Sequence, residues 1–137
     1  MEPAITPDDV LLVTPPTTYH RGDIVAFQPP ADWGAVDVPF IKRIVGLSGE
    51  SVSIRDGRVF VDGQPLDEPY IYPGHEPYEA TNVVGGSDAW VVSVGDVFVL
   101  GDHRAVSADS RVFGPVSLTA VTGRITWRCA PSPGPIR

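Results

Sequence analysis

Apolar residues in this chain gather in short runs rich in Val and Ile, and polar or turn-forming residues separate one run from the next. Short apolar runs bounded by turn residues are typical of β-strands. No long stretch has the periodicity of an amphipathic helix. The pattern therefore predicts a mainly β fold of antiparallel sheets with little helix. The expected strands cover residues 10–13, 24–27, 40–45, 52–54, 59–61, 89–92, 97–100 and 121–127.

The plainest alternation of apolar and polar residues predicts a β-hairpin. Val52 and Ile54 precede the pair Asp56-Gly57, and Val59 and Val61 follow it. An Asp-Gly pair between two alternating runs is a strong hairpin signal.

The stretch from Pro65 to Asp88 has little periodicity and is rich in Pro, Gly, Glu and Tyr. It predicts a long excursion over the surface. Its acidic residues are expected to form a solvated face: Asp67, Glu68, Glu76 and Glu79.

Composition narrows the classes of partner and site. The 137 residues, with 14 glycines and 15 prolines, fit one domain. A net charge of −7 with no clustered Lys/Arg face argues against a nucleic-acid partner. Cys129 is the single cysteine, so no intrachain disulfide forms, and three scattered histidines (His20, His75 and His103) give no metal-ligand spacing. No run of about 20 apolar residues predicts a membrane span in this chain.

Two stretches carry candidate chemistry. Lys42 emerges from the apolar strand 40–45, where it either reaches water or loses its proton. Residues 101–114 pack several polar groups into one loop after a strand: Asp102, Arg104, Ser107, Asp109, Ser110 and Arg111. Such a loop is either a polar turn with local ion pairs or, if it meets Lys42, one half of a Ser-Lys arrangement with lysine as general base.

Four sequence boxes in order carry a resemblance. They are Met1-Glu2-Pro3, Arg21-Gly22-Asp23-Ile24-Val25, Lys42-Arg43-Ile44-Val45-Gly46-Leu47, and the loop Gly101-Asp102-His103-Arg104 through Ser107 and Asp109-Ser110-Arg111 to Gly114-Pro115-Val116. In these boxes the chain closely resembles bacterial type I signal peptidases, the Ser/Lys proteases that remove signal peptides from exported preproteins. The stretch 65–90 is the unmatched part.

The resemblance assigns roles position by position. Lys42 corresponds to the general base and Ser107 to a serine that hydrogen-bonds and orients it. Structural support of the site falls to Asp102, Arg104, Asp109 and Arg111, and substrate binding to Met1, Pro39, Phe40 and Ile41. The family implies no cofactor and no metal. Its fold implies a catalytic core of residues 1–47 plus 96–129 and a smaller inserted β lobe at 48–95, while the proline-rich residues 130–137 are expected to form a disordered tail.

The sequence also departs from the family. The family's nucleophilic serine is expected immediately before Met1 and is absent, as is the N-terminal membrane helix that places the family's catalytic domain on the extracytoplasmic face of the bacterial cell membrane. Ala4 stands where threonine is usual, and His103 where asparagine is frequent. The expectation is a soluble, truncated version of the enzyme that cannot form an acyl-enzyme as written.

For Lys42 to accept a proton from serine, its pKa must fall well below the ordinary value of about 10.4. Burial among apolar neighbours lowers a lysine pKa by desolvation. The neighbouring Arg43 is expected on the opposite face of the strand, still charged.

Three other hypotheses stay open from the sequence. The chain could be a non-catalytic peptide-binding module with the same fold, although a binder has no need of a desolvated lysine. It could be a self-cleaving protein of the related Ser/Lys group, for which it offers no cleavable segment or DNA-binding domain. Finally, Ser107 could itself be the nucleophile for Lys42.

Overall fold

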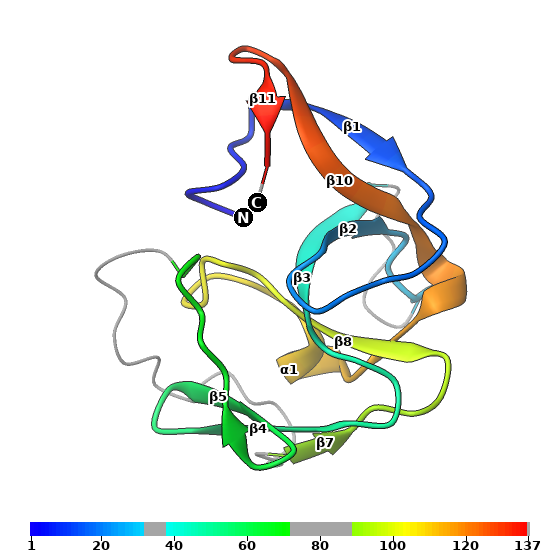
Figure 1. Cartoon of the computed structure of the whole chain (residues 1–137), viewed down its shortest axis with the longest axis vertical. Helices are drawn as coiled ribbons and strands as arrows, with labels where there is room; N and C mark the ends of the chain where they lie inside the picture. Colours follow the sequence, from blue (N-terminus) through cyan, green and yellow to red (C-terminus); the bar gives the residue numbers. More distant parts are fainter. Residues whose placement is uncertain (32–37, 72–88, 137) are drawn as a thin grey trace.

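The computed structural model describes residues 1–31, 38–71 and 89–136, and these residues form two antiparallel sheets (Figure 1). The larger sheet has the strand order β1-β10-β2-β3-β8-β9, with β11 paired to β10. Its strands are β1 (Val10–Thr14), β2 (Ile24–Phe27), β3 (Phe40–Gly46), β8 (Asp96–Leu100), β9 (Val116–Ser117), β10 (Val121–Ala130) and β11 (Gly134–Pro135). The prediction of a mainly β, antiparallel fold is confirmed.

The smaller sheet has the order β6-β5-β4-β7. Its strands are β4 (Ser51–Arg55), β5 (Arg58–Val61), β6 (Gln64–Pro65) and β7 (Ala89–Val91). The predicted hairpin joins β4 to β5, with positive φ at both Asp56 (47°) and Gly57 (74°). Positive φ at both central residues is what a tight two-residue hairpin turn requires.

Helical structure is short in the described residues. Helix α1 (Ser110–Phe113) follows the loop after β8, and a 3₁₀ turn, η3 (Leu118–Ala120), leads into β10. Neither they nor any other helix in ranges 1–31, 38–71 and 89–136 has the length and hydropathy of a membrane span.

The larger sheet buries side chains on both faces, as the alternation along β2 shows. Val25 and Phe27 pack with Ile44 on β3, whereas Ile24 and Ala26 belong to a second cluster on the other face. The second cluster also touches Met1, Ala4, Leu11, Ile41 and Ile136, so the N-terminal segment lies against the sheet beside β11.

A third cluster joins the two sheets. Val45 on β3 and Phe98 and Leu100 on β8 pack against side chains of the smaller sheet: Val52, Ile54, Val59, Val61 and Val92, the last just after β7. The sheets approach so closely at Gly46 that a Cβ there would lie 2.5 Å from Val52 Cγ2. The smaller sheet therefore shares its core with the larger one.

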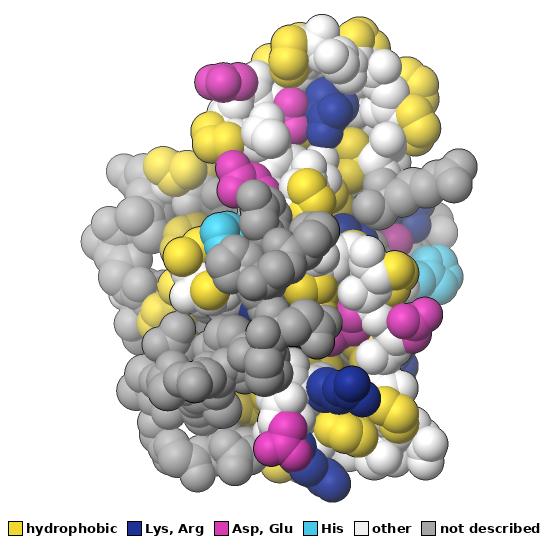
Figure 2. Space-filling model, turned by 90° about the vertical axis from the view of Figure 1, so that its left-hand side faces the viewer, with side chains coloured by type: hydrophobic (Ala, Val, Ile, Leu, Met, Phe, Trp, Pro, Cys, Tyr) yellow, Lys and Arg dark blue, Asp and Glu magenta, His cyan; other side chains and the backbone are white. Residues whose placement is uncertain are grey.

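Two sequence-based expectations differ from this fold. Where residues 130–137 were expected as a disordered tail, Gly134 and Pro135 pair with β10 and Ile136 N donates to Thr126 O (3.0 Å). Glu68, expected on a solvated face, is nearly buried in an ion pair with Arg104. The rest of the acidic excursion, including Glu76 and Glu79, lies outside the described residues. On the face in Figure 2, basic side chains of the described residues are scattered among acidic and hydrophobic ones.

Candidate active site

One pocket of about 470 Å³ brings together most of the residues that the sequence singled out. Lys42 on β3 and Ser107, from the loop between β8 and α1, both line it. The four residues expected to bind substrate line it too: Met1, Pro39, Phe40 and Ile41. Segments more than 60 residues apart in sequence thus converge on one cavity.

Lys42 is held in this pocket by the pairing of β3 with β2, where it lies opposite Val25. Its side chain is partly buried, with Nζ 5.4 Å from the centroid of the Phe40 ring. Burial lowers the pKa of Lys42 below its usual value, and Arg111 lowers it further, while Asp109 and Asp102 act in the opposite direction. Desolvation is the largest of these causes, because an ammonium group loses hydration that the neutral amine does not need.

Ser107 offers a buried hydroxyl with unused hydrogen-bonding capacity. Its Oγ makes no hydrogen bond within the described part of the chain, and no hydrogen bond joins it to Lys42 in this structure. Gly101 lies directly against it: a Cβ at position 101 would overlap Ser107 Oγ and lie 2.6 Å from Ser107 Cβ. Glycine is required there to let the loop close. A buried hydroxyl without a partner is costly, so Ser107 is ready to accept or donate a hydrogen bond in the pocket.

The loop that carries Ser107 is fixed from within by Asp109 and Arg111. Arg111 Nε donates to Asp109 Oδ1 (2.7 Å) and its Nη2 donates to Oδ2 (2.9 Å), with both side chains buried. Asp109 also accepts from Gly101 N (3.0 Å) and caps α1 through Arg111 N (3.2 Å). Arg111 Nη2 reaches the backbone oxygen of Ser107 (3.1 Å). This pair therefore ties both ends of the loop together.

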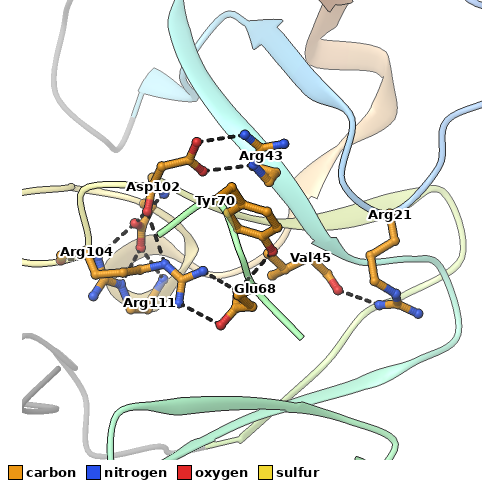
Figure 3. Close-up of polar contacts among 10 residues, drawn as sticks. Arg21, Arg43, Val45, Glu68, Tyr70, Asp102, Arg104 and Arg111 are labelled. Atoms are coloured by element: carbon orange, nitrogen blue, oxygen red, sulfur yellow. Dashed lines mark hydrogen bonds and ion pairs between the residues drawn. The ribbon is translucent and has the colours of Figure 1, made fainter. Parts of the chain in front are cut away.

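A second buried ion pair holds the start of the loop to β3 (Figure 3). Arg43 Nε donates to Asp102 Oδ1 (2.9 Å) and Nη2 to Oδ2 (2.7 Å), with side chains 3% and 1% exposed. Arg43 Nη1 also donates to Gly22 O (2.8 Å). Strand alternation directs Lys42 to the pocket and Arg43 to Asp102, so the neighbours serve different parts of the site.

A third ion pair reaches the same loop from the segment after β6. The two terminal guanidinium nitrogens of Arg104, Nη1 and Nη2, pair with the carboxylate of Glu68, and Arg104 Nε donates to Gly101 O (3.1 Å). The Tyr70 ring lies under the Arg43 guanidinium, 4.1 Å from Cζ to the centroid (Figure 3).

Comparison with known proteins fits this geometry. Residues 1–130 match the family model described as signal peptidase, peptidase S26. The chain belongs to the signal peptidase S26 family. A "Probable signal peptidase I-1" of Synechocystis is 34% identical over 96% of this chain and 72% of its own length. A "Signal peptidase I" of Leptolyngbya laminosa is 35% identical over 96% of this chain and 64% of its own.

The fold of a signal peptidase I from Enterococcus faecalis is similar too. That crystal structure superposes with a TM-score of 0.63 at 33% identity, covering 80% of this chain and 98% of its own. The chain thus has the fold of this family, and it spans only part of the length of the curated relatives named above.

Within this signal peptidase fold, sequence reasoning found the pocket residues and missed part of their support. Lys42, Ser107 and the Asp109–Arg111 pair follow from the boxes. Asp102 pairs with Arg43, 59 positions away, and Arg104 pairs with Glu68, 36 positions away. No local sequence pattern predicts either ion pair. Nothing in the sequence separates Glu68 from its exposed neighbour Asp67. Among the described residues no His, Cys, Asp and Glu side chains gather to hold a metal ion.

Proposed function

We propose that this chain is the catalytic region of a signal peptidase of the Ser/Lys type, which cuts signal peptides from exported preproteins at the membrane. One observation carries the proposal: the partly buried Lys42, with its pKa lowered by desolvation, lines the same pocket as the unpartnered hydroxyl of Ser107. A lysine amine whose pKa is lowered gives up its proton more readily and can act as a general base in place of histidine.

In this mechanism Lys42 takes the proton of a serine hydroxyl as that oxygen attacks the scissile carbonyl carbon. The resulting ammonium then gives the proton to the leaving amine, and water hydrolyses the acyl-enzyme ester. The nucleophile is the serine that the family resemblance expects directly before Met1, whose side chain lines the pocket. Ser107 orients the lysine amine through a hydrogen bond, which its free capacity allows.

The substrate would lie extended beside β3. Pairing of β3 with β8 begins at Arg43, so the pocket residues Ile41 and Lys42 precede the paired part of that edge. An extended peptide that adds to a sheet edge gains main-chain hydrogen bonds, while pockets for alternate side chains give specificity. The family resemblance implies small residues at the first and third positions before the cut. The larger sheet would then serve as catalytic core, from residues 1–47 and 96–129, with residues 48–95 as an inserted lobe.

The test uses a fluorogenic peptide with an Ala-X-Ala cleavage site and two versions of the protein: this chain, and one extended upstream to place a serine before Met1. We expect cleavage by the extended version alone. In it, Lys42→Ala abolishes turnover, and Lys42→Arg also fails because arginine keeps its proton. Turnover by either variant would refute the role of Lys42. Cleavage by the chain that starts at Met1 would point to Ser107 as nucleophile, and binding without cleavage by either version would favour a peptide-binding module.

A further inference from the structure

The segment 66–71, which leaves the smaller sheet after β6, reaches across to the loop that carries Ser107. We propose that Glu68 and Tyr70 are positioning residues: they hold this loop in place beside the active-site lysine. The inference rests on the proposed function only for its consequence on catalysis, and its structural part can be tested without any turnover. No box of the family resemblance includes either residue.

The first contact is the ion pair between Glu68 and Arg104. The two terminal guanidinium nitrogens, Nη1 and Nη2, donate to the carboxylate, and the side chains of Arg104 and Glu68 are 4% and 7% exposed. A two-pronged arginine–carboxylate pair fixes the relative orientation of its partners as well as their distance. Glu68 therefore balances the buried charge of Arg104 and sets where its guanidinium points.

Arg104 in turn binds the loop through hydrogen bonds to backbone groups. Its Nε donates to Gly101 O (3.1 Å), and its own backbone oxygen accepts from Arg111 Nη2 (2.8 Å). Gly101 is the residue packed against Ser107. The guanidinium held by Glu68 thus clamps the backbone that sets the position of the Ser107 hydroxyl.

Tyr70 adds a second connection two residues further along. Its hydroxyl donates to Glu68 Oε1 (3.0 Å), and its ring supports Arg43, which in turn pairs with Asp102 at the start of the loop. Burial raises the pKa of Tyr70, and the Glu68 charge raises it further, so the hydroxyl stays protonated and keeps donating. The segment thus contacts two of the buried arginines of the loop network, Arg43 and Arg104.

Removing the Glu68 charge leaves the Arg104 guanidinium buried without its counter-ion. A buried charge that loses its partner is strongly destabilising, which favours a rearrangement that exposes it to water. We expect Arg104 to turn outward, to release Gly101 O, and to let the Ser107 loop withdraw from the pocket. Lys42 then gains hydration, and its pKa rises toward the ordinary value.

Lys42 is the only lysine of the chain, so labelling lysine with ¹³C at the ε-carbon gives a single reporter signal. Titration of this signal by NMR measures the pKa of Lys42 directly in the full chain. We expect a higher pKa in Glu68→Gln than in the unsubstituted protein, and a smaller rise in Tyr70→Phe, which removes only the hydroxyl. The sign is diagnostic, because a purely electrostatic loss of a negative charge would lower the lysine pKa. The groups that act directly on Lys42 stay unchanged: Asp109, Arg111, Asp102 and the amino group of Met1.

Glu50→Gln is the matched control, because Glu50 forms a similar two-pronged pair with Arg21. This pair is more exposed than the Arg104–Glu68 pair, and neither of its residues lines the pocket. Its Lys42 titration should match that of the unsubstituted chain. In the version extended with the serine, Glu68→Gln should lower kcat by about 10- to 100-fold with KM changed by less than about two-fold, because misplacement of a catalytic group acts on the chemical step. The acid limb of the pH–rate profile should move to higher pH, and Glu68→Asp should restore part of the rate.

A folded Glu68→Gln protein with an unchanged or lowered Lys42 pKa would overturn the proposal, and would reduce Glu68 to a structural role. If Glu68→Gln does not fold, Tyr70→Phe decides by the same criterion. If no version cleaves peptide while the Lys42 pKa still rises in Glu68→Gln, the positioning role stands and the proposed function fails.

Discussion

The buried pair of Arg43 and Asp102 gives a sharp prediction for stability. Asp102→Asn keeps the shape of the side chain but removes the charge that pairs with the Arg43 guanidinium, which is 3% exposed. Breaking a buried ion pair from one side costs about 3–5 kcal/mol, whereas an exposed pair contributes at most about 1 kcal/mol. The control is again Glu50→Gln, whose pair with Arg21 has side chains 30% and 20% exposed.

Urea unfolding followed by circular dichroism measures the difference. With a slope of about 2 kcal/mol/M, the loss predicted for Asp102→Asn lowers the midpoint by roughly 1.5–2.5 M, against less than about 0.5 M for Glu50→Gln. A double variant, Arg43→Met with Asp102→Leu, should recover much of the loss, because no unpaired charge remains buried. If Asp102→Asn costs no more than the control, the reasoning from burial to energy is refuted for this pair.

Two further predictions concern the pocket. Because the pKa of Lys42 is lowered on folding, the folded chain binds fewer protons than the unfolded chain between the two pKa values, so the free energy of unfolding rises with pH across that window. Lys42→Met should remove this rise and be more stable at neutral pH. Urea unfolding at pH 7 and pH 10 measures both effects, and an equal change of stability with pH in the two proteins would contradict the prediction. Gly101→Ala places a methyl group against Ser107 and should lower the free energy of unfolding by about 1–3 kcal/mol. The control is Gly134→Ala, whose added methyl group would have nothing within 4 Å and should cost less than about 0.5 kcal/mol in the same assay. Equal losses of stability in the two variants would show that the Ser107 loop can shift to accommodate the methyl group.

Much of the fold could be predicted because its signals are local. Alternation and β-branched runs located the main strands, and Asp56-Gly57 located the β4–β5 turn. The period of two along β3 also placed Lys42 and Arg43 on opposite faces. Each of these inferences needs only a few consecutive residues.

The remaining features depend on which elements meet in space. Glu68 lies beside the exposed Asp67 in a stretch without periodicity, so its burial is decided by Arg104, 36 residues away. Arg43 was expected to stay charged but not to be enclosed, since the sequence cannot show that Asp102 and the Tyr70 ring close over it. Ion pairs across sheets follow from tertiary packing, which no local pattern encodes.

The apolar cluster shared by the two sheets has a consequence for cooperativity. Val45 and Phe98 of the larger sheet share one core cluster with Val52 of the smaller sheet, and the Val52 side chain lies close against Gly46. Opening the smaller sheet alone would expose core side chains of β3, the strand that carries Lys42. The two sheets should therefore exchange their amide hydrogens with the same free energy and melt in a single transition, so that a destabilising substitution in the β4–β5 hairpin also affects the surroundings of Lys42.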